Sequence, residues 1–189
     1  MTENGLASQM VTQNTAVPWS QSSAEVVTPS QLRDVMSQFA TGVVVLTVGG
    51  IHIHGMTANA FSSVSLEPPL VLCCVARTAI MHQAITATGR FAVSVMAAEQ
   101  EDWARYFADK TRPLGATQFD AVNWTPGRHT GAPLLTGSLA WLECELTESY
   151  EHGDHSVFLG TVLDSSRGHG GNSLLFFDGG FHHFAGGDR

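Results

Sequence analysis

The segment HGMTANAFSSVSLEPPLVLCCV, residues 54–75, joins two contrasting halves. Its first half is rich in small and hydroxylated residues, and it contains no lysine, arginine or aspartate before Glu67. Its second half, residues 69–75, is an apolar run that predicts a strand buried on both faces. Small uncharged side chains allow a backbone to approach a flat ligand, so that N–H and C=O groups can bond to ring edges. The first half therefore favours a site for a large planar ring, and the alternative is an ordinary polar edge strand with a turn.

The segments around this stretch predict a mainly β chain with a few helices. We expect strands at residues 43–48, 51–56, 69–75 and 90–97, two strands around the turn at residues 152–154, and a hairpin over residues 173–184. We expect three helices. The first begins at Thr28 or Ser30 and ends at Gly42, the second covers residues 78–89 with Thr78 as N-cap, and the third covers residues 98–110. Residues 111–133 are rich in turn residues and predict a long loop. This order favours an antiparallel barrel decorated with helices.

Composition limits the classes of partner. The chain has 189 residues, which suits one domain, residues 30–189, after a flexible polar leader at residues 1–29. Only 14% of the residues are charged, and such a low-charge surface favours self-association. The net charge of −8 argues against nucleic acid and against an anionic membrane surface. No apolar run approaches the ~20 residues that cross a bilayer.

Cysteine and histidine usage argues against disulfides and metals. Cys73, Cys74 and Cys144 are an odd set with two adjacent members, which predicts free thiols in a reducing, cytoplasmic compartment. The first residues also lack the basic and apolar pattern of a secretory signal. Nine histidines are present, yet no Cys-x-x-Cys or His-Glu-x-x-His motif accompanies them. We therefore expect no metal site.

Known catalytic and phosphate motifs are also missing. There is no Gly-x-Ser-x-Gly elbow, no Gly-x-x-x-x-Gly-Lys loop and no Gly-x-Gly-x-x-Gly turn. Arg77 and Thr78, however, stand at the predicted start of a helix, where free N–H groups attract anions. An aromatic ligand that carries a phosphate could bridge this point and residues 55–65. The alternative is a surface charge beside a helix cap.

Six segments together resemble the flavin reductase domain family, the small NAD(P)H:flavin oxidoreductase components of two-component flavin monooxygenases. They are FATGVVVLTV at 39–48, GMTANAFSSVSLEPPLVLCCV at 55–75, GRFAVSVM at 89–96, GSLAWLECEL at 137–146, GDHSVFLGTV at 153–162 and LLFFDGGFHHF at 174–184. The resemblance covers about residues 30–185. It implies a split β-barrel that binds flavin and forms a homodimer, with the flavin sites near the subunit interface.

The resemblance also implies roles for individual residues. The implied contacts with the flavin ring and ribityl chain are Thr57, Ala58, Asn59, Ser62 and Ser63. The implied phosphate-side segment is Cys74, Val75, Ala76, Arg77 and Thr78. Phe107 and Lys110 are expected to reach the flavin tail. His155, in the Gly-Asp-His motif, and Phe181 are expected to contact the nicotinamide of NADH.

The implied activity is hydride transfer from NADH to FAD or FMN, with reduced flavin released to a partner monooxygenase. This chemistry requires no side-chain nucleophile, which agrees with the missing motifs. The residues do not distinguish FAD from FMN. NADH is favoured because no basic cluster awaits the 2′-phosphate of NADPH, although Arg77 or Arg128 leaves NADPH open. Two alternatives stand: a flavoprotein of the same fold that holds FMN tightly and reduces another acceptor, and a non-catalytic flavin-binding module.

Overall fold

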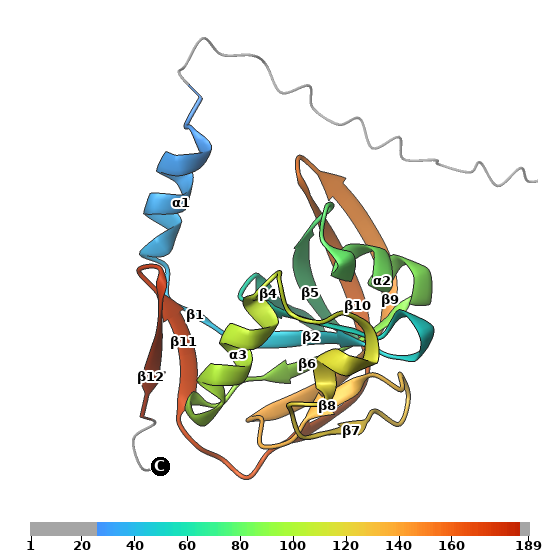
Figure 1. Ribbon diagram of the computed structural model, residues 1–189. Coiled ribbons are helices and arrows are strands. Elements are labelled where there is room, and N and C mark those ends of the chain that lie inside the picture. The colour runs from blue at the N-terminus through green and yellow to red at the C-terminus, as the bar shows by residue number, and fades with distance from the viewer. Residues whose placement is uncertain (1–25, 186–189) are drawn as a thin grey trace, which may run out of the picture.

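A seven-stranded antiparallel sheet forms the body of the protein (Figure 1). The computed structural model describes residues 26–185, so most of the predicted leader, and its predicted flexibility, lies outside the described part. The helices are α1 Pro29–Ser37, α2 Ile80–Thr88 and α3 Glu101–Ala108, with short 3-10 helices η1 Gly50–His52, η2 Ala98–Gln100 and η3 Gly115–Phe119. The strands are β1 Thr41–Gly42, β2 Val44–Val48, β3 His54–Ala58, β4 Phe61–Leu66, β5 Pro69–Ala76, β6 Arg90–Val95, β7 Trp124–Pro126, β8 Pro133–Leu135, β9 Ala140–His152, β10 His155–Arg167, β11 Ser173–Phe177 and β12 Gly180–Phe184. The prediction of a mainly β chain is confirmed.

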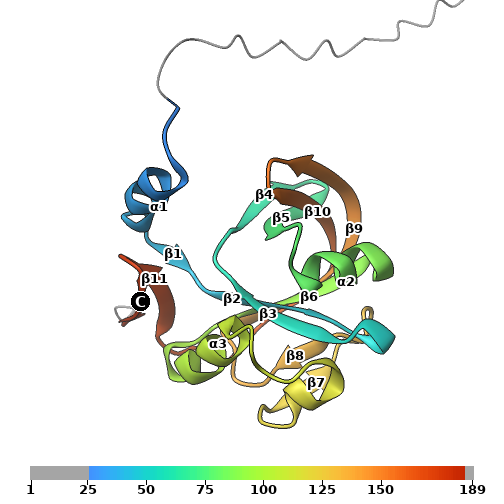
Figure 2. The same ribbon diagram turned by 45° about the horizontal axis from the view of Figure 1, so that its top comes forward.

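The order of the strands brings the two edges of the sheet together. The order is β3-β2-β6-β9-β10-β5-β4, so β3 and β4 are opposite edges. These two strands are nevertheless consecutive in sequence, with only Asn59 and Ala60 between them. The sheet must therefore curl until the end of β3 meets the start of β4, as Figure 2 shows. The small residues of the quoted segment lie at this meeting point.

Two apolar cores lie on the two faces of β2. Val44, Leu46 and Val48 pack inside the curled sheet, and Met81 and Ile85 of α2 close that core. Val45, which lies between Val44 and Leu46 in the sequence, packs on the other face of β2. Its neighbours there include Phe107 of α3, Phe119, Leu135 and Leu174. Alternate side chains of a strand point to opposite faces, so β2 is buried on both. Strand β2 is thus fixed from both sides, and it pairs with the edge strand β3.

The prediction that residues 69–75 are buried on both faces is wrong. In β5, Val71, Cys73 and Val75 are buried, whereas Leu70, Leu72 and Cys74 are only partly covered. One face of β5 packs in the core inside the curled sheet, and the other looks outward. An apolar run predicts a buried strand, but it does not show whether the rest of the chain covers one face of that strand or both.

Helix boundaries are partly as expected. Thr28 caps α1 with a full capping box, but the helix ends at Ser37 and not at Gly42. Helix α2 ends as predicted, because Gly89 adopts φ 64° at its C-cap. The N-cap of α2, however, is Ala79 instead of Thr78, so Thr78 lies in the turn before the helix.

Two further expectations need correction. The predicted strand over residues 51–56 begins only at His54, because Gly50–His52 form η1. The predicted loop at 111–133 contains η3, and its end forms the small β7–β8 pair. The two predicted hairpins are present as β9–β10 and β11–β12. Among the described residues, no helix has both the length and the apolar character that a bilayer span requires.

Candidate functional site

Strand β3 is an edge strand whose outer side is partly covered by side chains. The Gly55 N–H donates to Oε1 of Gln118 at 2.8 Å, and the Gly55 C=O accepts a hydrogen bond from the guanidinium of Arg112. Both backbone groups of Gly55 therefore point away from β2. The period of two along a strand turns the backbone N–H and C=O of Thr57 to the same outer side. These groups of Thr57 are available to a ligand that lies beside β3.

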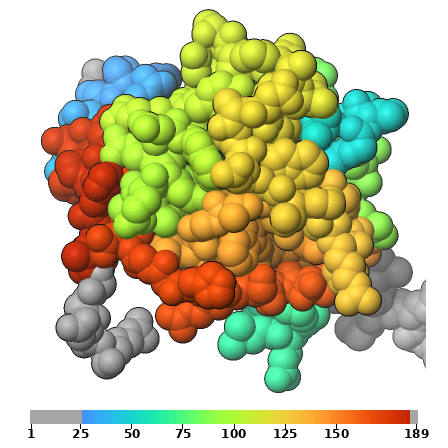
Figure 3. Space-filling view, turned by 60° about the horizontal axis from the view of Figure 1, so that its bottom comes forward, coloured from blue at the N-terminus to red at the C-terminus, as the bar shows by residue number. Residues whose placement is uncertain are grey.

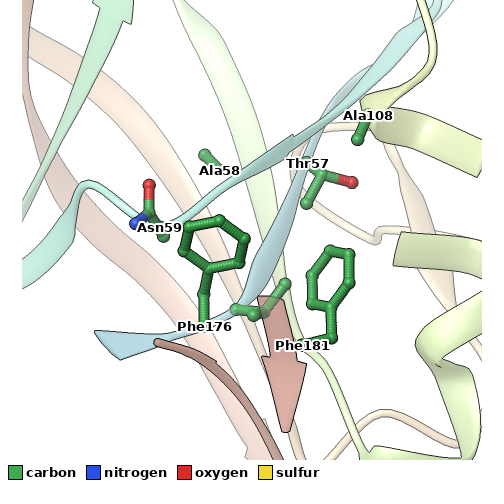
Figure 4. A pocket seen from close by; sticks show the side chains of 7 residues that line it. Thr57, Ala58, Asn59, Ala108, Phe176 and Phe181 are labelled. Carbon is green, nitrogen blue, oxygen red and sulfur yellow. The ribbon is translucent and has the colours of Figure 1, made fainter. Parts of the chain in front are cut away.

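Beside Thr57 lies a cavity of about 170 Å³, the Thr57 cavity, drawn in Figure 4. Its lining is Val43, Thr57, Ala58, Asn59, Ala108, Phe176 and Phe181. The two phenylalanines come from β11 and β12, and their rings pack edge to face with centroids 5.5 Å apart. The hydroxyl of Thr57 donates to the carbonyl of Ala104 at 2.6 Å, which fixes β3 against α3. The lining contains no charged side chain and is suited to an aromatic ring system.

The Lys110 cavity, of about 390 Å³, continues from the Thr57 cavity, since Thr57 and Ala108 line both. The rest of its lining is His54, Met56, Ala76, Thr78, Ala79, Ile80, Phe107, Lys110, Arg112 and Leu114. Lys110 and Arg112 bring positive charge to this cavity, and no aspartate or glutamate lines it. The start of α2, at Ile80, adds free N–H groups. The cavity is thus suited to an anionic group.

His54 and Arg112 form a buried pair at one side of the Lys110 cavity. The Nε2 of His54 lies 3.3 Å from a guanidinium nitrogen of Arg112 and accepts its hydrogen bond. Burial, together with the positive charge of Arg112, lowers the pKa of His54 to about 4. His54 is therefore neutral at physiological pH, and Arg112 retains the charge.

A third cavity, of about 570 Å³, lies at the other end of β3 and is called the Cys74 cavity. It shares Asn59 with the Thr57 cavity, and Ser62 and Cys74 also line it. Met36 of α1 and Phe39, which follows the helix, also line it. The cavities therefore follow β3 and the β3–β4 link in sequence order.

The sequence-predicted site residues divide into two groups. The cavities bring together Thr57, Ala58, Asn59, Ser62, Cys74, Ala76, Thr78, Phe107, Lys110 and Phe181. Ser63, Val75, Arg77 and His155 line none of the three. The side chain of Val75 is buried in the core, so only its backbone could meet a ligand.

Arg77 and His155 lie near the Lys110 cavity without lining it. Arg77 forms an exposed ion pair with Glu151, with a nitrogen–oxygen distance of 3.0 Å. His155 is the cross-strand neighbour of Ala76, which does line the cavity. Nδ1 of His155 lies 2.8 Å from the carboxylate of Asp154, and this bond holds the pKa of Asp154 below its usual range. The roles predicted for both residues stay predictions.

Sequence reasoning missed several of the lining residues. Arg112 falls in the predicted long loop at residues 111–133, although it stands only two residues after Lys110. Phe176 belongs to a hairpin that was predicted, and its alternation with Leu175 could have shown which face it shares with Phe181. Ala108 and Met56 offer no chemical signal, because small or apolar side chains become lining residues only through the packing of α3 on β3.

Thiol and metal chemistry find no support among the residues that the structure describes. No group of three or more His, Cys, Asp or Glu side chains there is arranged to hold a metal ion. Burial raises the pKa of both Cys73 and Cys144 to about 12, so these thiols are protonated and unreactive. Burial also raises the pKa of Cys74. All three are free cysteines, as predicted.

Comparison with known proteins gives one consistent result. A family model described as "Flavin reductase like domain" matches residues 36–185. An NADH-dependent FAD reductase of Streptomyces globisporus is 53% identical over 165 residues, which cover 86% of this chain and 91% of that protein. The reductase subunit HsaB of a flavin-dependent monooxygenase from Rhodococcus jostii is 37% identical over 158 residues, 82% of this chain and 78% of HsaB.

A solved structure agrees with these sequence relatives. BorF, the flavin reductase component of a bacterial two-component tryptophan halogenase, superimposes with a TM-score of 0.80 at 48% identity. The match covers 85% of this chain and 99% of BorF. Because the family model spans most of the chain and the curled sheet has the same architecture, the protein belongs to the flavin reductase-like domain family.

Proposed function

We propose that the protein is an NADH-dependent flavin reductase that uses FAD or FMN as a substrate and releases it reduced. The observation that carries this proposal is the outward-facing backbone of Thr57 beside an uncharged cavity that continues into a cationic one. A flavin has the matching order of parts, because a flat, neutral ring system is joined by a flexible chain to an anionic phosphate. Relatives that are NADH-dependent FAD reductases and monooxygenase reductase subunits support the same activity.

The flavin ring would lie in the Thr57 cavity. There the backbone of Thr57 and the amide of Asn59 supply neutral donors and acceptors, while Ala58 leaves space for close approach. The flavin phosphate would lie in the Lys110 cavity, beside Lys110, the Thr78 hydroxyl and the start of α2. Ser62, Ser63 and Cys74, at and beside the Cys74 cavity, would flank the edge of the ring.

The nicotinamide side would be formed by Phe181 and His155. Phe181 is held in place from outside, since the Arg105 guanidinium lies 4.8 Å from its ring centroid. The Asp154 carboxylate orients the His155 imidazole, which stands next to the cavity-lining Ala76 in the β5–β10 ladder. Both side chains would therefore position the dinucleotide against the flavin.

Flavin and NADH supply the redox chemistry between them, and the protein supplies orientation. Two rings that are stacked at a reactive distance gain much of their rate from this positioning. Val43, Phe176 and Phe181 make the Thr57 cavity apolar and would exclude water from the stacked pair. The neutral lining would bind oxidised and reduced flavin with similar strength, which suits a substrate that must leave for a monooxygenase or halogenase.

We also propose that the split barrel acts as a homodimer. Helix α1 has no buried residue within its own chain, and Leu32, Val35 and Met36 are exposed on it. Phe39, just after the helix, is also exposed and borders the Cys74 cavity. A second copy that covers this apolar surface would also contact the Cys74 cavity, because Met36 and Phe39 line it, which supports flavin sites near the interface.

The test is the loss of NADH absorbance at 340 nm with and without added flavin. We expect turnover that saturates with free FAD or FMN, and protein that loses its flavin on gel filtration in flavin-free buffer. A tightly held flavin with turnover independent of added flavin would favour the flavoprotein with another acceptor. Yellow protein without NADH oxidation would favour the non-catalytic module.

A substitution at Lys110 tests the orientation of the flavin. Lys110→Gln removes a charge from the proposed phosphate end, so the KM for FMN should rise about tenfold. Riboflavin, which has no phosphate, is the matched control, and its KM should not change. An equal rise for FMN and riboflavin would show that the phosphate does not lie beside Lys110.

A further inference from the structure

A fourth cavity, the Ile51 cavity, extends the Lys110 cavity beyond the proposed phosphate site. It has a volume of about 230 Å³ and lies between η1, the start of α2 and residues 114–115. His54, Ile80 and Leu114 line both cavities, so the two are neighbours with a common wall. A ligand that fills the Thr57 and Lys110 cavities would thus find a further compartment at its phosphate end.

Large aliphatic side chains surround the Ile51 cavity and are open to solvent. Ile51 is 96% exposed, Leu114 57% and Ile80 45%. They come from η1, from the start of α2 and from the residue before η3, and all three line one cavity. Figure 3 shows the residues near 50, in cyan, beside the residues that follow α3, in yellow. Such a group of exposed aliphatic side chains is suited to covering a flat apolar ring.

Positive charge separates this apolar compartment from the Thr57 cavity. Lys110 and Arg112 line the intervening Lys110 cavity, and neither it nor the Ile51 cavity is lined by an aspartate or glutamate. Arg112 is only 9% exposed, and its Nε has no hydrogen-bond partner in the described structure. Buried polar groups are normally paired, so a free donor at a cavity wall points to an anionic ligand. Lys110 and Arg112 could together bind two phosphate groups.

We propose that the Ile51 cavity binds the adenosine of FAD, with the pyrophosphate between Lys110 and Arg112, so that the enzyme prefers FAD to FMN. This inference rests on the proposed flavin reductase function and names its substrate more closely. The order of features along β3, from uncharged cavity to two cations to aliphatic compartment, matches the order of ring, pyrophosphate and adenosine in FAD.

An adenosine phosphate is also part of NADH, so the experiment must separate the two sources. We assign the compartment to FAD because it shares a wall with the cavity that would hold the flavin phosphate. The expected discriminating property is the affinity for FAD relative to FMN, measured without NADH.

The test is equilibrium binding of FAD and FMN, followed by quenching of flavin fluorescence, in Ile51→Ser and Leu114→Ser variants. Each substitution removes an exposed aliphatic contact with the adenine, so the Kd for FAD should rise about tenfold, whereas the Kd for FMN should not change. Leu66→Ser is the control, because Leu66 is also largely exposed, on β4, but lines none of the four cavities. It should alter neither Kd.

Two further results complete the test. In the unmodified protein, 5′-AMP should displace FAD but not FMN. Equal Kd values for FAD and FMN, or variants that weaken both flavins equally, would overturn the adenosine assignment while leaving the reductase function intact. A higher KM for NADH with an unchanged Kd for FAD would instead assign the compartment to NADH. If neither flavin binds, the proposed function itself fails.

Discussion

A Cβ atom at position 55 would lie 2.6 Å from Cε1 of Phe107, so only glycine leaves room there for this ring. Phe107 is fully buried and forms part of the wall of the Lys110 cavity. Its ring also packs against Phe119 of η3, with centroids 5.4 Å apart. The glycine of the quoted segment therefore sets how closely α3 and η3 approach β3, and with it the shape of the cavity.

Gly55→Ala should force Phe107 to move and should lower the free energy of unfolding by about 1–3 kcal/mol, as overpacked cores do. It should also weaken flavin binding, because the displaced ring enters the Lys110 cavity. Urea denaturation and flavin fluorescence would measure both effects. Gly42→Ala is the control, since a Cβ atom at that position meets nothing within 4 Å. Equal stability of the two variants would contradict the close approach.

The lowered pKa of His54 predicts acid sensitivity. Its folded-state value of about 4 lies below the ordinary 6.5, so the unfolded chain takes up a proton before the folded protein does. The stability is therefore fully present above pH 6.5 and falls as the pH decreases from 6.5 towards 4, by about 3 kcal/mol in total. Urea denaturation between pH 7.5 and 4 would show this slope.

His54→Gln should flatten that slope, because glutamine cannot take up the proton but retains an acceptor for Arg112. His52→Gln, at an exposed position on η1, should leave the slope as it is. An unchanged pH dependence in the His54 variant would show that another group causes the acid sensitivity.

Glu143→Gln should destabilise the protein, because the Glu143 carboxylate is a buried hydrogen-bond acceptor. Glu143 is buried, and its carboxylate accepts hydrogen bonds from the backbone N–H groups of Arg128, His129 and Thr130 and from the Thr130 hydroxyl. Burial acts to raise the pKa of Glu143, but these bonds outweigh it and the pKa is lowered. An amide turns N–H groups towards these donors, so we expect a loss of about 1–3 kcal/mol in chemical denaturation.

Glu145→Gln provides the control for that experiment. Glu145 lies two residues further along β9, is exposed, and pairs with Arg90 at 3.2 Å. Exposed ion pairs contribute little, so its loss should change the stability by less than about 1 kcal/mol. A similar effect of both substitutions would mean that the carboxylate of Glu143 does not organise residues 127–131.

His155→Ala should raise the KM for NADH about tenfold and leave the Kd for flavin unchanged, because His155 is predicted to contact only the nicotinamide side. Stopped-flow mixing of NADH with the flavin-loaded protein would measure this. His152→Ala is the matched control, since His152 faces His155 across the β9–β10 turn. An unchanged KM for NADH in the His155 variant would remove this residue from the site.

Local patterns were enough to predict much of the fold. Gly89 marked the end of α2, and the Gly-Asp turn after His152 marked the β9–β10 hairpin. The 3-10 helix before His54 was not predictable, because β-branched Ile51 and Ile53 alternate with histidines as they would in a strand. The burial of Glu143 was missed for a similar reason: strand alternation does not show that a distant loop covers the outward face.

The candidate site was predictable where side chains carry a chemical signal. Thr57, Asn59 and Lys110 do meet along one row of cavities. Arg77 pairs with Glu151, so the role predicted for it stays a prediction, whereas Lys110 and Arg112 line the Lys110 cavity. The place of Arg112 beside that cavity depends on how the chain after α3 folds back onto β3, which is a property of tertiary packing and not of local sequence.

The open flank of β3 has a consequence for the behaviour of the protein without substrate. Unpaired peptide groups at a sheet margin invite strands from other molecules, and Gln118 and Arg112 cover only the Gly55 portion. A bound heterocycle would screen the remainder at Thr57. The supply of flavin would then affect the resistance of the enzyme to aggregation as well as its turnover. Protein without flavin would precipitate sooner than protein with flavin bound.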